Sequence, residues 1–278
     1  MEFTGQTEPT GPLLMGVVNV TPDSFSDGGR FLATDDAIWH GTALLADGAD
    51  ILDVGGESTR PGATRPVVAE ELARVVPVIT ELAREGAMVS VDTMRADVAE
   101  KAVEAGATII NDVSGGLADP RILEVARDTG VGYVCMHWRA HSDHMAEFTD
   151  YPDGVVHGVI SELRGRLDAL SAAGLDEEQI ILDPGLGFAK TADHNWELLR
   201  AIPDLEALGF PLLIGASRKT FLGALLVDSE GHLRPVDQRE SAHLAVVTAL
   251  AMHRVWGIRA HDVRASRDAC KAVERLNP

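Results

Sequence analysis

Apolar and polar positions follow two alternating patterns along this chain. Short apolar runs rich in β-branched residues are each followed by a turn signal and a longer amphipathic stretch. The short runs predict buried strands, and the longer stretches predict helices that pack on them. The predicted strands are 13–19, 50–54, 87–92, 107–111, 131–136, 179–183, 211–215 and 257–261. The predicted helices are 34–47, 67–85, 95–105, 120–129, 153–173, 192–202, 237–255 and 263–275.

Strand–helix alternation indicates a parallel sheet, and eight such units in a chain of 278 residues match the size of a closed (β/α)8 barrel. An open doubly wound sheet is the competing fold. It usually has a glycine-rich phosphate loop after its first strand, whereas this chain continues with NVTPDSFSDGG. The sequence therefore predicts an α/β TIM barrel. With no Pro/Ser-rich linker and no internal repeat, one barrel domain is expected over 13–278, after a flexible lead at 1–12.

Charge and composition exclude several classes of protein. A formal net charge of −19 and a pI near 4.8 argue against electrostatic binding of nucleic acid. No apolar run approaches the roughly 20 residues that span a membrane, and the N-terminus lacks the features of a signal peptide. We expect a cytoplasmic protein in which Cys135 and Cys270 are buried free thiols.

Polar or ionisable residues lie at or near the carboxyl end of every predicted strand. They are Asn19, Asp53, Asp92, Asn111, Asp112, His137, Asp183, Lys219, Arg259 and His261. Some could simply cap the following helices. A full ring of such residues, however, is typical of an active site, because barrel enzymes build theirs at this end.

The chemistry of these residues divides by charge. Asp92, Asn111 and Asp183 can hydrogen-bond a flat, nitrogen-rich heterocycle, since carboxylates accept N–H bonds and an amide both donates and accepts. The cationic set of Lys219, Arg259 and His261 suits a phosphate or diphosphate. Asn19 is a weak candidate ligand for a hard cation such as Mg²⁺, which takes few protein ligands.

Two loops rich in Gly, Pro and Ser follow the first and second predicted strands, at 21–29 and 55–66. Segments of this composition are commonly surface turns without a role. Here both belong to the predicted active face, so they are candidate lids over the site.

Taken together, eight ordered strings resemble dihydropteroate synthase from about residue 13 to the C-terminus. They are NVTPDSFSDGG, DVGGESTRPGA, SVDTMR, NDVSGG, MHWR, LDPGLGF, GASRK and RAHDVR. MHWR is similar to the actinobacterial members. The resemblance implies a homodimeric barrel of folate biosynthesis that joins 4-aminobenzoate to (7,8-dihydropterin-6-yl)methyl diphosphate. The products are 7,8-dihydropteroate and diphosphate.

The resemblance also implies roles for individual residues. The pterin would be bound by Asp92, Asn111, Val113, Met136, Asp183, Phe188, Gly215 and Lys219. The diphosphate would be held by Asn19, Thr59, Arg259 and His261, with Mg²⁺ on Asn19. The 4-aminobenzoate pocket, where sulfonamides compete, would consist of Phe25, Arg60, Pro61, Ser217 and Lys219. The catalytic residues would be Asp27, Asp92 and Lys219, with Asp27 supporting a cationic intermediate when its loop closes.

Two other functions remain open on the sequence. A corrinoid-linked methyltransferase would bind a reduced folate in a similar barrel, but it has no need of the SRK string or of the Arg259 and His261 pair. A catalytically silent relative would retain pterin binding alone. Diphosphate release distinguishes a synthase from both.

Overall fold

The structure is a computed structural model that describes residues 11–20, 30–57, 66–141 and 145–277. Within these residues, eight strands form one sheet in the order β6-β5-β4-β3-β2-β1-β8-β7, and every pair is parallel. The strands are β1 (Leu13–Asn19), β2 (Ile51–Gly55), β3 (Met88–Asp92), β4 (Ile109–Asp112), β5 (Gly132–Met136), β6 (Ile180–Asp183), β7 (Leu213–Ile214) and β8 (Gly257–Ala260).

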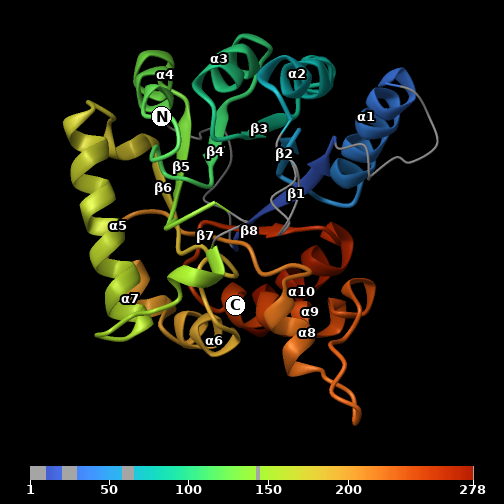
Figure 1. Cartoon of the computed structure of the whole chain (residues 1–278). Helices are drawn as coiled ribbons and strands as arrows, with labels where there is room; N and C mark the ends of the chain where they lie inside the picture. The colour runs from blue at the N-terminus through green and yellow to red at the C-terminus, as the bar shows by residue number, and fades with distance from the viewer. Residues whose placement is uncertain (1–10, 21–29, 58–65, 142–144, 278) are drawn as a thin grey trace.

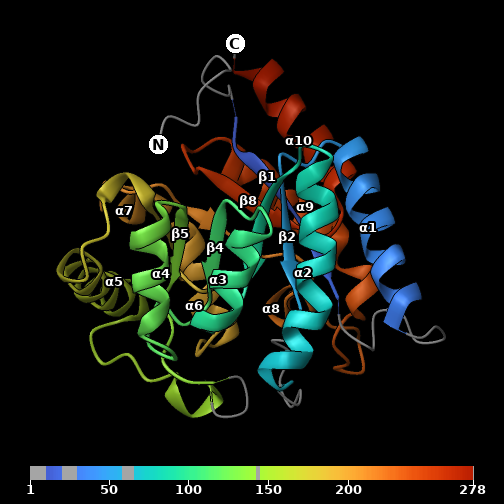
Figure 2. The ribbon, with the colours of Figure 1, turned by 90° about the horizontal axis from the view of Figure 1, so that it is seen from above.

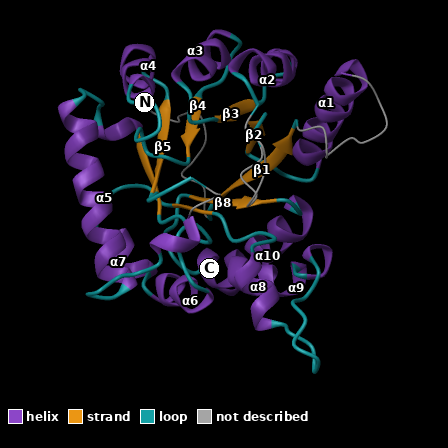
Figure 3. Ribbon diagram, in the orientation of Figure 1, coloured by secondary structure: helices purple, strands orange, loops and turns teal. Residues whose placement is uncertain are grey.

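The two edges of this sheet meet, and the barrel closes. A parallel bridge pairs Leu182 of β6 with Leu212, the residue before β7. The amide of Leu182 also donates to the carbonyl of Pro211 at 2.8 Å. Figure 1 shows the strands arranged around a centre, and Figure 3 shows the helices outside them. The predicted barrel is confirmed, and the open doubly wound alternative is wrong.

Helices cover the outside of the barrel, as the view from above also shows (Figure 2). They are α1 (Arg30–Ala46), α2 (Val68–Arg84), α3 (Ala96–Glu104), α4 (Arg121–Thr129), α5 (Val155–Ala172), α6 (Ala192–Arg200), α7 (Ile202–Glu206), α8 (Thr220–Leu225), α9 (Glu240–Ala251) and α10 (Val263–Leu276). Short 3₁₀ turns occur at η2 (Met145–Phe148), η3 (Glu177–Gln179) and η4 (Val236–Gln238). Among the described residues, no helix has the length and apolar character needed to cross a membrane.

Several predicted boundaries were wrong. The helix expected at 192–202 ends at Arg200, and α7 begins anew with Pro203 in its first turn, where a missing N–H costs nothing. The helix expected at 237–255 spans only Glu240–Ala251. Helix α8 was missed, because its six residues are too few to show a period and include Gly223.

The last two strands are shorter than expected. β7 has two residues instead of the predicted 211–215, because Pro211 has no amide to donate and Leu212 makes only the isolated bridge. β8 ends at Ala260, so His261 follows the strand instead of lying on it. Because Gly215 and His261 both fall outside their strands, more irregular backbone lies at the end of the barrel where the polar side chains gather.

The barrel interior is built in layers, because alternate residues of each strand point inward. One buried cluster inside the barrel is apolar and consists of Met15, Ile51, Ile109, Val134, Ile181 and Leu213. Two residues further along five of these strands come Asp53, Asn111, Met136, Asp183 and Gly215. The other face of the strands packs against the helices in a separate, larger core. The same period of two thus seals one end of the barrel and lines the other with polar groups. Cys135 and Cys270 are free and buried, as predicted.

Candidate active site

An inner cavity of about 70 Å³ opens at the carboxyl ends of the strands. Its wall consists of Asp92, Asn111, Val113, Met136, Asp183, Phe188, Gly215, Ser217, Lys219, Arg259 and His261. All eight residues predicted for the pterin are in this set, together with two predicted for diphosphate and one for 4-aminobenzoate. Acceptors from β3, β4 and β6 therefore share one mouth with cations from the end of the chain. Had Asp183 and Arg259 faced opposite ends of the barrel, no single site could have contained both.

A network of hydrogen-bonded charged and amide side chains lies at the floor of this cavity. The guanidinium of Arg259 donates from Nε to Asp53 Oδ2 at 2.7 Å and from its terminal nitrogen to Asp92 Oδ2 at 3.0 Å. Asn111 Nδ2 donates to the same Asp53 oxygen at 2.9 Å. Arg259 was predicted as a diphosphate ligand. The structure shows in addition that it bonds two carboxyl groups, and that Asp53 orients both Arg259 and Asn111.

The Asp92 carboxyl group has a perturbed pKa. Burial, with the neighbouring Asp53 carboxylate, raises the pKa of Asp92 to about 7, against the opposing effect of Arg259. Burial lowers the pKa of the Arg259 guanidinium, but Asp53 and Asp92 outweigh burial and raise it overall. The cation is therefore permanent, while Asp92 gains or loses its proton near neutral pH. A titratable group in a cleft with a specific charge partner is typical of a functional site.

Asp183 and Lys219 face each other across the other side of the cavity. The Asp183 carboxylate accepts the amide of Gly185 at 2.7 Å, and burial raises its pKa against the opposing charge of Lys219. The Lys219 ammonium donates to the carbonyl of Leu186 and lies 5.0 Å from the centre of the Phe188 ring. Burial lowers the pKa of Lys219 to about 8. This lysine thus connects the turn after β7 to the loop after β6.

The SRK string forms a strained turn that places Ser217 and Lys219. Arg218 has a φ of +63°, which a side chain disfavours, and its carbonyl accepts a bond of 2.8 Å from the guanidinium of Arg239. Gly223 leaves room for that guanidinium, since a Cβ there would lie 2.6 Å from Arg239 Nε. Ser217 Oγ accepts the amide of His261 at 3.2 Å and lies 2.9 Å from its Nδ1. The turn and the end of β8 are therefore tied together.

An outer cavity of about 570 Å³ continues from the inner one toward solvent. Asn19, Arg259 and His261 share its wall with Lys190, Arg218 and Arg239. Among the described residues, no group of three or more His, Cys, Asp or Glu side chains could hold a metal. Mg²⁺ bound chiefly by water and phosphate oxygens needs only one or two protein oxygens, and the Asn19 amide fits that requirement.

Five predicted site residues lie outside the described residues: Phe25, Asp27, Thr59, Arg60 and Pro61. Their roles stay predictions, as does most of the predicted lead at 1–12. The described approach to the second loop is well anchored. Arg74 donates to the carbonyl of Gly56 at 2.7 Å, and buried Glu71 accepts from Thr93 at 2.6 Å and from Arg95 at 2.8 Å.

Sequence reasoning missed Lys190, which lies on the outer cavity wall beside His137. A lysine after a glycine-rich loop is normally solvated, so its residue type gave no signal. The usable signal was its position, two residues after Phe188 in the string that begins LDPGLGF.

The fold and the cavity define an α/β-barrel enzyme whose substrate site lies at the carboxyl ends of its strands. A sequence profile of the family described as "Pterin binding enzyme" matches residues 15–261.

Similar proteins show which of the pterin-binding enzymes this chain resembles. Dihydropteroate synthase of Mycobacterium leprae is 54% identical over 261 residues, which cover 94% of this chain and 92% of that one. A structure of Xanthomonas albilineans dihydropteroate synthase with 4-aminobenzoic acid superposes with a TM-score of 0.87 at 41% identity, over 96% of this chain and 93% of that one. The structure of Yersinia pestis dihydropteroate synthase in a sulfonamide drug complex superposes with a TM-score of 0.88 at 38% identity, over 96% of this chain and 95% of that one. This chain belongs to the dihydropteroate synthase family and is a transferase of folate synthesis.

Proposed function

We propose that the mouth of this barrel condenses 4-aminobenzoate with (7,8-dihydropterin-6-yl)methyl diphosphate, giving 7,8-dihydropteroate and diphosphate for tetrahydrofolate biosynthesis. One observation carries the proposal: the inner cavity gathers Asp92, Asn111 and Asp183 opposite Lys219, Arg259 and His261. The working unit is the barrel domain at 13–278. The Xanthomonas structure with 4-aminobenzoic acid supports the choice of the second substrate.

The pterin would lie in the inner cavity, where its polar edge meets buried acceptors. Asp183 and Asp92 would accept N–H bonds, and Asn111 would offer both a donor and an acceptor. Val113, Met136 and Phe188 would cover the faces of the ring, with Gly215 leaving space for it. Buried hydrogen-bonding groups discriminate strongly, because an analogue that lacks a partner leaves one of them unpaired.

The diphosphate would leave first, so the reaction would be SN1-like. Arg259 and His261 lie where the inner and outer cavities join, and they would neutralise the departing charge together with Thr59. The remaining methylene cation is stabilised by electron donation from the reduced ring. Asp183 and the ionised form of Asp92, held in a site of low dielectric, would favour that positive charge. Lys219 would hold the pterin, and Asp27 would support the cation from its loop. A nucleophilic side chain is not required.

Asn19, on the wall of the outer cavity, would hold Mg²⁺, and the metal would supply charge neutralisation for the departing diphosphate. The 4-aminobenzoate would occupy the adjacent wall, at Ser217 and Lys219, with Phe25, Arg60 and Pro61. Its amine would attack the methylene carbon, forming the C–N bond and releasing one proton to solvent. The same pocket would accept sulfonamides as competitors, a proposal supported by the Yersinia complex.

The direct experiment incubates the purified chain with the pterin diphosphate, 4-aminobenzoate and Mg²⁺. We expect dihydropteroate and diphosphate to form in equal amounts, with a sulfonamide raising the KM for 4-aminobenzoate. Pterin binding without diphosphate release would indicate a silent relative. Methyl transfer from a methylated reduced folate to a corrinoid would instead indicate the methyltransferase.

Removal of Mg²⁺ should stop the reaction. With a chelator in excess we expect the rate to fall at least about 100-fold, because the metal is asked to supply a few kcal/mol of charge stabilisation. The variant Asn19→Ala should need more Mg²⁺ for half-maximal rate, measured by titrating the metal. An unchanged rate in chelator would exclude the metal from the mechanism.

We also propose a cytoplasmic homodimer. The location is supported by two free, buried cysteines, a state that reducing compartments maintain. The dimer is supported by exposed apolar side chains near α8 and α9, among them Leu225, Val236 and Met252. Light scattering should give twice the chain mass of 29.6 kDa, and cell fractionation should recover the protein with the cytoplasm. A monomer at micromolar concentration would contradict the dimer.

A further inference from the structure

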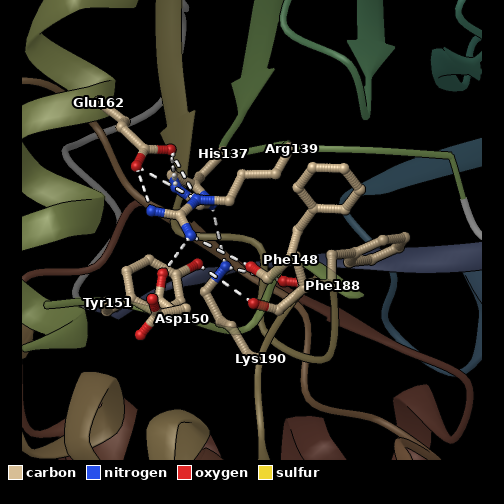
Figure 4. A network of polar contacts seen from close by, with 9 residues as sticks. His137, Arg139, Phe148, Asp150, Tyr151, Glu162, Phe188 and Lys190 are labelled. Carbon is tan, nitrogen blue, oxygen red and sulfur yellow. Dashed lines mark hydrogen bonds and ion pairs between the residues drawn. The ribbon is translucent and has the colours of Figure 1, made fainter. Parts of the chain in front are cut away.

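Lys190 is half-buried, and its ammonium group lies on the wall of the outer cavity, next to the pterin cavity. Its Nζ lies 3.0 Å from His137 Nδ1 and donates to the carbonyl of Phe188 at 3.0 Å (Figure 4). Of the described residues, only these two are bonded to it. The lysine thus connects the end of β5 to the loop between β6 and α6.

The bonding fixes how His137 is protonated. Because an ammonium only donates, His137 Nδ1 accepts, and its Nε2–H donates to Glu162 of α5 at 3.0 Å. Burial and then the charge of Lys190 lower the pKa of His137 to about 4, so the ring is neutral at physiological pH. Neutral His137 therefore links Glu162 to Lys190 through its two ring nitrogens, and it adds no second positive charge.

A second set of contacts, made by Arg139 and Tyr151, also reaches the loop between β6 and α6. Arg139 grips the Glu162 carboxylate with its guanidinium and donates to the carbonyls of Phe148 and Asp150 at 3.1 and 2.7 Å. The guanidinium carbon lies 3.7 Å from the centre of the Tyr151 ring. The Tyr151 hydroxyl donates to the carbonyl of Ala189 at 3.2 Å.

Two successive carbonyls of the loop, those of Phe188 and Ala189, therefore accept hydrogen bonds from Lys190 and Tyr151, and the backbone at Ala189 is strained. Ala189 has a φ of +47°, and Gly185 and Gly187 have φ values of +67° and +78°. A side chain in the left-handed region persists only where the surroundings enforce it. The bonds of Lys190 to Phe188 and of Tyr151 to Ala189 act at this point.

This loop forms part of the substrate site. Phe188 lines the inner cavity, and its ring lies beneath the Lys219 ammonium. The carbonyl of Leu186 accepts from Lys219, and a Cβ on Gly187 would lie 3.0 Å from Lys219 Cδ. A shift of the loop would move both the aromatic wall and the lysine.

Folding stability alone does not account for a lysine here. Burial lowers the pKa of Lys190 to about 7, which means that its charged form is held at a cost. Five charged or titratable groups from the surrounding elements face it: His137, Arg139, Glu162, Asp183 and Lys219. A methionine would fill the same space without that cost, because water from the outer cavity can donate to the two acceptors that the ammonium leaves.

We propose that Lys190 is a positioning residue for pterin recognition: it holds the 185–190 loop so that Phe188 and Lys219 present the geometry that the pterin requires. The inference rests on the proposed function and deepens it. It also gives a role to Arg139 and Tyr151, which complete the hold on the same loop.

The test is Lys190→Met, compared with wild type and with Lys101→Met, which removes an exposed lysine that pairs with Glu104. We expect the KM for the pterin diphosphate, and the Kd for a dihydropterin without diphosphate, to rise about 100-fold, as expected for misplacement by about 1 Å. The kcat and the KM for 4-aminobenzoate should change less than about threefold. Lys101→Met should match wild type throughout. Tyr151→Phe, which removes only the second carbonyl bond, should show a smaller rise of about tenfold.

The melting temperature separates positioning from a structural role. For wild type, the folded pKa of Lys190 lies below its unfolded value, so its cost is full below pH 7 and declines as pH rises toward 10.5. Lys190→Met should therefore melt at or above the wild-type temperature at pH 6, and its advantage should shrink by pH 9. Lys219 titrates in the same direction but is common to both proteins.

Three outcomes decide the proposal. Weaker pterin binding with an undiminished melting temperature supports it. An unchanged KM for the pterin overturns it, as does a parallel loss of melting temperature and of all kinetic constants. Inactivity of the wild-type chain would instead refute the proposed function, and dihydropterin binding by both proteins would then still measure the effect of Lys190.

Discussion

Replacing Lys219 by methionine should abolish synthesis of dihydropteroate while leaving the fold intact. We expect kcat/KM for the pterin diphosphate to fall by about a thousandfold, the upper range for loss of one preorganised donor in a closed site. The reason is positional: the ammonium faces Asp183, the Phe188 ring and the carbonyl of Leu186 at the junction of both proposed substrate pockets. Diphosphate release measures turnover, and circular dichroism checks the fold.

The control for this prediction is Lys219→Arg, which keeps the charge. The lysine stem passes closely over Gly187, so the broader guanidinium will not reach the same position. We expect recovery of no more than about tenfold. Turnover close to wild type in Lys219→Met would remove this residue from the proposed site.

Of the substitutions proposed here, replacing Arg259 by methionine should cause the largest loss in the free energy of unfolding. The guanidinium is the shared counter-charge of Asp53 and Asp92, and its side chain is 23% exposed. Removing one partner of a buried ion pair typically costs about 3–5 kcal/mol, because the remaining charges lose their compensation. Urea unfolding at pH 7 should show this loss, together with loss of turnover.

The pH dependence checks the cause of that loss. Burial raises the pKa of Asp92 and Arg259 holds it down to about 7, so without Arg259 that pKa rises further and Asp92 stays protonated at pH 6. The variant's relative loss of stability should therefore be smaller at pH 6 and larger at pH 9, where Asp53 and Asp92 repel each other as carboxylates. Adding Asp53→Asn to Arg259→Met should also recover part of the lost stability at pH 7. A loss that is identical at both pH values would point to lost packing instead of unpaired charge.

The arrangement of the site was largely predictable because it follows from a period of two along each strand. Once β1 to β6 were located, Asn19, Asp92, Asn111 and Asp183 had to lie near the same end of a parallel barrel. Register confirms this, since Asn19 pairs with Gly55, Gly55 with Asp92, and Asp92 with Asn111. Strand geometry alone carries this information.

The contacts between side chains could not be predicted in the same way. Arg259 reaches Asp53 and Asp92 across 206 and 167 residues of sequence, and nothing local to any of the three indicates the pairing. Lys190 resembles a solvated loop lysine until β5 and α5 enclose it. The two-residue β7 depends on its neighbours β6 and β8, so its sequence overstated its length.

The closure of the barrel has a consequence for how ligand and protein affect each other. Between β6 and β7 the backbone is joined by a single bridge, to which the hydrogen bond from the Leu182 amide to the Pro211 carbonyl belongs, and this makes the seam the natural place for the wall to open. Asp183 stands on one side of the seam and Lys219 on the other. A ligand bound to both residues would link the two sides of this seam. Ligand binding would therefore reduce local opening of the barrel.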